Sequence, residues 1–289
     1  MIHHFFKHCQ RRPKLVTVTL VGAVFFGVLA LHALDAYAVK ITMKRVIFEG
    51  TKRAEVLTLI NNTGDEQAYR LGWRNMRLTE DAGLKEIPEG ETRADSRFAH
   101  QMVIFAPRRV VIPPGGSQQI RLMLRKPKDL ADGEYRSHLW IRPEAEAVKF
   151  EAKPVEEGKS AVQIKMLAGV SLPVFVRIGQ MTATAKFESA AARQADGKLK
   201  IDLVLSRQGN RSLYGDFDFI CTGGEEKVLR QVRGIAIYPE VAQRRFNFNF
   251  PLPKEGLTGC SAMRIVYTAD KEDPLFKGNV IAQTNANLQ

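Results

Sequence analysis

Side chains that could do covalent or metal chemistry are few in this sequence and lie far apart. Beyond the first 38 residues there are only two histidines, His100 and His138, in different segments. Neither belongs to a serine or cysteine nucleophile arrangement, and no His/Cys cluster has metal spacing. The sequence has no phosphate-binding loop and no dinucleotide fingerprint, and its acidic residues are scattered. We therefore expect no enzyme, no cofactor, no bound metal and no small-molecule substrate.

The residues with a regular spacing lie in the stretch 161–178, AVQIKMLAGVSLPVFVRI. Six alternate side chains in it are apolar: Val162, Ile164, Met166, Ala168, Val170 and Leu172. A period of two is typical of a strand with one face for apolar partners. The run exceeds the roughly five or six residues of an ordinary strand. Two interpretations are open: a long core strand, or a strand whose first half is an exposed edge offered to another protein.

The stretch follows a long segment without periodicity. Residues 143–160 are rich in Glu and Lys and contain no alternating pattern. Loops of that length inside a compact domain are usually functional or mobile. Such a loop would let the following edge stay loose until a partner arrives.

The first 38 residues have the pattern of an export signal. A basic segment with Arg11, Arg12 and Lys14 precedes an apolar run over 15–34, and Ala36-Tyr37-Ala38 has small residues where a signal peptidase cleaves. The run is also about long enough to span a bilayer, so an uncleaved anchor is the alternative.

Cleavage would leave two cysteines in an oxidising compartment. Cys9 is lost with the leader, and Cys221 and Cys260 both adjoin strand-like segments. We predict one structural disulfide between them; two free buried thiols are the alternative.

The rest of the chain has the pattern of an all-β protein. Apolar runs between turn clusters predict seven strands in the first half, at 41–48, 54–60, 67–78, 103–106, 118–124, 134–142 and 161–178, with a long loop at 80–101. Six more are predicted at 182–187, 199–205, 212–221, 227–237, 244–250 and 262–268. Trp73 and the alternating Phe246, Phe248 and Phe250 are expected in cores. We predict two immunoglobulin-like sandwiches, 39–179 and 180–289, that meet at Gly179-Gln180.

The chain is basic, with a formal net charge of +12. A nucleic-acid or anionic-surface module is one interpretation of such a charge. However, Lys and Arg are spread over both halves without interleaved aromatic residues, so we expect no nucleic-acid partner and a generally basic exported protein.

Four motifs resemble the N-terminal domain of the PapD-like periplasmic pilus chaperones: KRVIFEG at 44–50, LINNTGDEQAYRLGW at 59–73, FAPRRVVIPPGGSQQIRL at 105–122 and GEYRSHLWIR at 133–142. Their order and spacing fit, and the match covers about 39–180. The resemblance implies a divergent member of the chaperone–usher pathway in the periplasm, with two immunoglobulin-like domains in an L-shaped or boomerang arrangement.

The same resemblance implies a function. Chaperones of this family bind pilus or fimbrial subunits by donor-strand complementation, prevent their aggregation and deliver them to an outer-membrane usher. The donor strand would be 162–172, with its face formed by Val162, Ile164, Met166, Ala168 and Val170. The alternative is a structural or adhesive envelope protein without chaperone activity, whose edge strands would be blocked.

The resemblance also implies a site for the subunit's terminal carboxylate. Arg45 matches the family's cleft arginine, whose guanidinium fork pairs two carboxylate oxygens. The family's second cleft residue is a lysine, and the alignment places Leu172 there, so that part of the site does not transfer. Lys165 and Arg136 are the candidates to compensate; for each, a solvated strand charge is the alternative.

Overall fold

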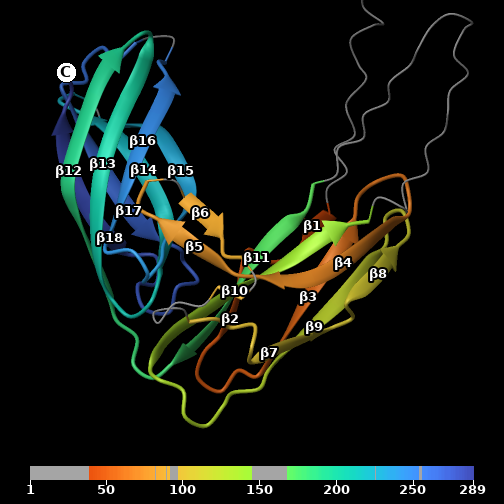
Figure 1. The fold of residues 1–289 in the computed structure, drawn as a ribbon. Coiled ribbons are helices and arrows are strands. Elements are labelled where there is room, and N and C mark those ends of the chain that lie inside the picture. The colour runs from red at the N-terminus through yellow and green to blue at the C-terminus, as the bar shows by residue number, and fades with distance from the viewer. Residues whose placement is uncertain are drawn as a thin grey trace, which may run out of the picture. The chain divides into compact units, whose positions relative to one another are not determined.

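The computed structural model describes residues 39–81, 83–88, 90–91, 97–144, 168–224, 226–253 and 256–289. These residues form 18 strands and no helix (Figure 1). The predicted all-β fold is therefore confirmed. Residues Ala38–Gln289 form one compact unit, and the predicted signal segment lies outside the described residues.

Two sheets enclose the first core. One has the strand order β1-β3-β9-β7 and the other the order β2-β11-β10-β4-β8. The first contains β1 (Val39–Ile41), β3 (Ala54–Asn61), β9 (Ser117–Leu124) and β7 (Val103–Ala106); the second contains β2 (Val46–Phe48), β11 (Val170–Ile178), β10 (Gly133–Pro143), β4 (Gln67–Arg74) and β8 (Arg109–Ile112). Apolar side chains from both sheets, such as Leu57, Leu122 and Leu139, fill the space between them. Trp73 packs against this core with its ring centroid 5.4 Å from that of Phe105, as predicted.

Two further sheets enclose the second core. Their strand orders are β12-β13-β16 and β15-β14-β17-β18. Their bounds are β12 (Ala183–Ala195), β13 (Lys198–Gly209), β16 (Gln243–Pro251), β15 (Lys227–Ile237), β14 (Leu213–Thr222), β17 (Ala262–Ala269) and β18 (Val280–Asn287). Phe217 lies fully buried, with Phe246 at 5.2 Å between ring centroids. Phe248 and Phe250 pack against the same core, so the three alternating phenylalanines belong to it, as predicted.

The strand predicted at 41–48 is wrong as a single element. β1 pairs with β3 in one sheet, whereas β2 pairs with β11 in the other. The chain changes sheets between them, and the core-facing positions change from odd-numbered residues (Val39, Ile41) to even-numbered ones (Val46, Phe48). The prediction of one strand over 41–48 missed this change.

The loop predicted at 80–101 is wrong in part, and one strand was missed. A hairpin formed by β5 (Met76–Thr79) and β6 (Gly83–Glu86) occupies part of the expected loop at 80–101. β18 (Val280–Asn287) was not predicted, because its sequence, VIAQTNAN, has no sustained apolar alternation. Pairing with β17 holds it in the sheet, and Ala286 is buried in the second core.

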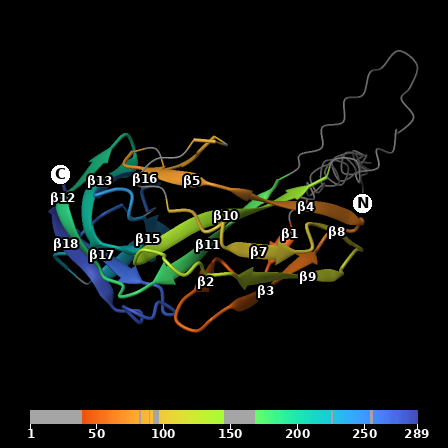
Figure 2. The ribbon, with the colours of Figure 1, turned by 60° about the horizontal axis from the view of Figure 1, so that its bottom comes forward.

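β11 contributes to both cores. Val174 and Val176 lie in the first core, whereas Phe175 between them lies in the second. Figure 2 shows β11 beside β10, with which it pairs along its length. The strand ends before Gly179, whose φ of +73° favours glycine. The domain boundary predicted at this glycine stays a prediction.

Candidate functional site: the open edge of β11

β11 is flanked on both sides only in its second half. On one side it pairs antiparallel with β10 from Val170 to Ile178. On the other side the parallel strand β2 covers only Val174 to Val176. Among the described residues, no strand pairs with this second side before Val174. The free N–H and C=O groups of such an edge can bind an added strand.

The even-numbered side chains along this open edge become more exposed towards the N-terminal end of β11. Leu172 is buried, Val170 is partly buried against the first core, and Ala168 just before the strand is exposed. The sequence continues the same alternation upstream with Met166, Ile164 and Val162. These three residues, like Lys165, lie outside the described residues. Their role in a donor face stays a prediction. In the described part of that face, exposure rises from Leu172 to Ala168, towards these three residues.

Arg45 lies where the open part of the edge begins. β2 starts at the next residue, and its register places Arg45 level with Pro173 of β11. The guanidinium lies over the ring of Tyr214, 4.2 Å from the ring centroid, and 3.6 Å from Asp270 Oδ1. The Arg45 side chain makes no hydrogen bond to any residue that the structure describes. A cation with uncommitted donors therefore lies at the foot of the open edge.

Among the described residues, the row that contains Arg45 runs through Pro173 and His138 to Arg74, so its next cation lies three strands away. Leu172, the aligned position of the family's lysine, is buried in the first core. Pro173 takes the place beside Arg45, and His138 of β10 lies opposite Pro173. His138 is buried and its Nδ1 has no described partner. Burial, with a smaller effect of the Arg136 charge, lowers the pKa of His138 to about 3, so this imidazole is neutral.

Arg136 is not brought together with Arg45. It lies opposite Phe175, two residues further along β11, and its guanidinium pairs with Glu240 at 2.6 Å. The same Nη2 donates to the Met76 carbonyl at 2.8 Å. The ion pair lines a cavity of about 420 Å³. As placed, the Arg136 charge is already neutralised by Glu240, so Arg136 offers little to an incoming carboxylate.

A buried ion pair on the same sheet face was not predicted. Arg177 Nε donates to Glu134 Oε2 at 2.9 Å, and Arg177 Nη1 donates to Glu49 at 3.2 Å. Glu134 also accepts hydrogen bonds from the backbone N–H and the hydroxyl of Ser212, at 3.1 and 2.9 Å. The sequence signal for it was a charge inside an apolar strand, at Arg177 in VFVRI.

The second sandwich contains a further buried pair, between Arg211 and Asp273 at 2.5 Å. Burial lowers the pKa of Arg211 most strongly, and the nearby positive charge of Arg177 lowers it further. Both residues lie in turns whose sequences resemble ordinary solvated loops, so no sequence signal indicated their burial.

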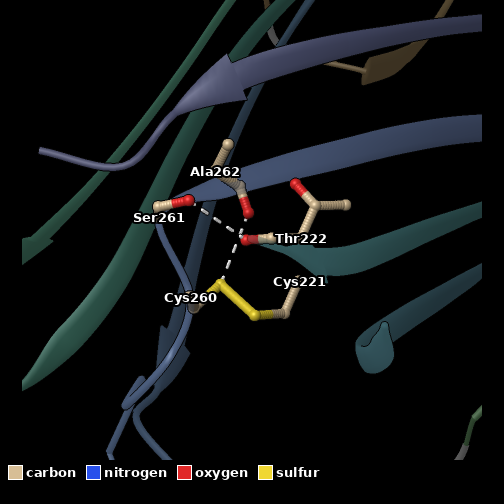
Figure 3. Close-up of a disulfide and its surroundings, with 5 residues drawn as sticks. All are labelled: Cys221, Thr222, Cys260, Ser261 and Ala262. Carbon is tan, nitrogen blue, oxygen red and sulfur yellow. Dashed lines mark hydrogen bonds between the residues drawn. A yellow bond between two sulfur atoms is a disulfide. The ribbon is translucent and has the colours of Figure 1, made fainter. Parts of the chain in front are cut away.

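The predicted disulfide is present (Figure 3). Cys221, near the end of β14, is bonded to Cys260, with Cα atoms 5.4 Å apart and a sequence separation of 39. The neighbouring Ser261 N–H donates to the Thr222 carbonyl at 3.0 Å. The bond therefore ties the loop before β17 to the end of β14, far in sequence from β11.

Two other properties concern only the described part of the chain. It contains no group of three or more His, Cys, Asp or Glu side chains that could hold a metal ion. It also contains no helix with the length and apolarity that crossing a bilayer requires.

Comparison with known proteins gives distant structural neighbours. No protein-family model matches the chain, and no curated protein does so significantly. Among the solved structures, the Pseudomonas aeruginosa CupB2 chaperone is 13% identical with a TM-score of 0.44, over 86% of this chain and 100% of that one. The E. coli chaperone DraB is 15% identical with a TM-score of 0.39, over 88% and 97%.

A third neighbour is a Salmonella enterica structure of the SafA pilin in complex with the SafB chaperone. It is 13% identical with a TM-score of 0.42, over 89% of this chain and 99% of the matched one. Likeness at this distance assigns no function. All three structures contain chaperones.

Proposed function

We propose that this chain is a periplasmic chaperone that binds pilus or fimbrial subunits through the open edge of β11 and the residues upstream of it, and delivers them to an outer-membrane usher. The observation that carries the proposal is the one-sided pairing of β11. Before Val174 the described residues leave one side of the strand free, and its apolar face reaches the surface at Ala168.

The physical requirement for such a chaperone follows from the state of its client. A subunit that lacks one strand exposes core side chains and unpaired backbone groups, which makes it prone to aggregate. A donor must supply main-chain hydrogen bonds along an edge and apolar side chains at alternate positions. β11 supplies the first over 170–173, and the alternation from Leu172 back to Val162 supplies the second.

Arg45 marks the position where the open part of the β11 edge ends. A guanidinium can pair both oxygens of a carboxylate, and Arg45 lies level with Pro173, where β2 stops covering β11. A subunit strand that adds to the open edge would have its terminal carboxylate within reach of this cation. We propose that Arg45 fixes the position of the captured strand along β11.

The same edge disfavours the alternative of a structural or adhesive envelope protein. Such a protein would protect its edges, because a free edge with apolar side chains invites unwanted pairing. Among the described residues β11 has no such cover before Val174.

Substitutions on the two sides of the donor segment test the proposal. Ile164→Asp would place a carboxylate in the apolar groove of the subunit, which costs several kcal/mol, so capture should fall by more than about tenfold. Gln163→Asp adds the same charge on the opposite face and should leave capture nearly unchanged. The measurement is co-purification with a fimbrial subunit that lacks its last strand. Equal capture by both variants would contradict strand donation.

A further inference from the structure

Arg45 already has a carboxylate beside it in the free protein. Asp270, just after β17, lies 3.6 Å from the Arg45 guanidinium. We propose that Asp270 is an internal competitor, which occupies the place at Arg45 that the terminal carboxylate of a subunit takes on capture. This inference rests on the proposed function, because it concerns the regulation of the same site.

The Arg45–Asp270 contact is an ion pair without a hydrogen bond. Charge-assisted bonds between guanidinium and carboxylate are about 2.7–2.9 Å long, clearly shorter than the 3.6 Å found here. The two side chains are 12% and 18% exposed, so water and an incoming carboxylate can reach them. Asp270 therefore balances the charge of Arg45 without using its directional donors.

Tyr214 keeps those donors available. The guanidinium carbon lies 4.2 Å from the centroid of the Tyr214 ring, within the range of a cation–π contact. All five N–H groups of a guanidinium lie in its own plane. A partner that covers one of its faces holds Arg45 in place and still leaves N–H groups at its rim for a ligand.

Asp270 is held in place by its own turn. Its backbone N–H donates to the Tyr214 carbonyl at 3.1 Å, and its Oδ1 accepts from the Glu272 N–H at 2.9 Å. These bonds do not involve Arg45. The competing carboxylate therefore stays near the site whether or not Arg45 is engaged by a ligand.

Competition of this kind adds selectivity. A free carboxylate gains little at Arg45, since it replaces one ion pair by another. A carboxylate at the end of a strand gains the main-chain bonds along β11 as well, so it can displace Asp270. The site then favours ligands that combine an extended strand with a free C-terminus, and binding stays weak enough for later release.

The test compares two synthetic peptides, KTVTVTVTV with a free C-terminal carboxylate and the same peptide as its C-terminal amide. Fluorescence anisotropy gives their dissociation constants for the full chain and for Asp270→Asn. The asparagine oxygen can still accept from Glu272, so the turn is kept. We expect Asp270→Asn to bind the carboxylate peptide about fivefold more tightly, the size of a partly exposed ion pair, and the amide peptide unchanged.

Asp218→Asn is the matched control, because it removes the same charge from β14, where Asp218 accepts a hydrogen bond from Gln231. It should leave both dissociation constants unchanged. Unchanged or weaker binding of the carboxylate peptide by Asp270→Asn, with normal binding of both peptides by the wild type, would overturn the competitor role alone. Failure of the wild type to bind either peptide would overturn strand donation, and the competitor role with it.

Discussion

Two arginines on the same face of one sheet form ion pairs that differ in almost every physical respect. Arg177 and Glu134 are 3% and 1% exposed, and Glu134 accepts three hydrogen bonds. Arg45 and Asp270 are 12% and 18% exposed, and no hydrogen bond joins them. We call Arg177–Glu134 the locked pair, because it is buried and hydrogen-bonded. We call Arg45–Asp270 the loose pair, because it is partly exposed and lacks a hydrogen bond between its two side chains.

The difference separates a pair that supports the fold from a pair that is available for the proposed binding role. A buried charge whose partner is removed keeps its desolvation cost, so the locked pair is hard to open. A partly exposed pair loses little when it opens, because water and salt replace the partner. The loose pair is thus the one that a ligand can enter, although both pairs combine an arginine with a carboxylate.

The largest effect should come from breaking the locked pair. Glu134→Gln leaves Arg177 buried with the partly exposed Glu49 as its one remaining counter-charge among the described residues, so we expect a loss of about 3 kcal/mol or more in the free energy of unfolding. Chemical denaturation measures it. Glu86→Gln, which removes an exposed partner of Arg74, is the control and should cost under about 0.5 kcal/mol. A loss from Glu134→Gln as small as that of the control would contradict the distinction.

His138 offers a second test of the cost of burying a charge. Its side chain is buried, and its Nδ1 has no partner among the described residues. Burial lowers its pKa to about 3 in the folded chain, against about 6.5 when unfolded. The unfolded state therefore binds more protons below pH 6.5, and stability is lost as the pH falls from 6.5 towards 3. At pH 4.5 the loss relative to pH 7 is roughly 2.5 kcal/mol.

The measurement is the free energy of unfolding at pH 7 and pH 4.5, for the wild type and for His138→Gln. The glutamine variant cannot take up this proton, so its decrease between the two pH values should be smaller by that amount. Parallel pH profiles for the two proteins would show that His138 is not the group responsible.

The smallest effect on stability should come from the loose pair. Arg45→Ala should lower the free energy of unfolding by about 1 kcal/mol or less. The same variant should lose the preference for a peptide with a free carboxylate over its amide, because the cation at the foot of the edge is gone. A destabilisation as large as that of Glu134→Gln would place Arg45 among the locked groups and argue against its role in capture.

Local patterns predicted much of this molecule. The period of two and the turn residues predicted most of the strands, and the two cysteines left after the leader predicted the disulfide. The motif around Arg45 identified a residue that does lie at the foot of an open edge. Each of these signals is contained in a short stretch of sequence.

The features that were missed depend on register between distant segments. Glu134, Arg177 and Ser212 come from three strands or turns, and nothing in one stretch indicates that they meet. Asp270 reaches Arg45 from near the opposite end of the chain. Arg136 was a candidate for the site, but Glu240, also distant in sequence, neutralises it. Tertiary pairing, rather than residue type, decides which arginine is available.

The alternation of β11 between two cores has a further consequence. Val174 and Val176 are held by one set of apolar neighbours, and Phe175 is held by another. A substitution that removes either set of neighbours is therefore expected to weaken the packing of the same short stretch of β11. The two sandwiches therefore share part of their packing through the residues of this one strand.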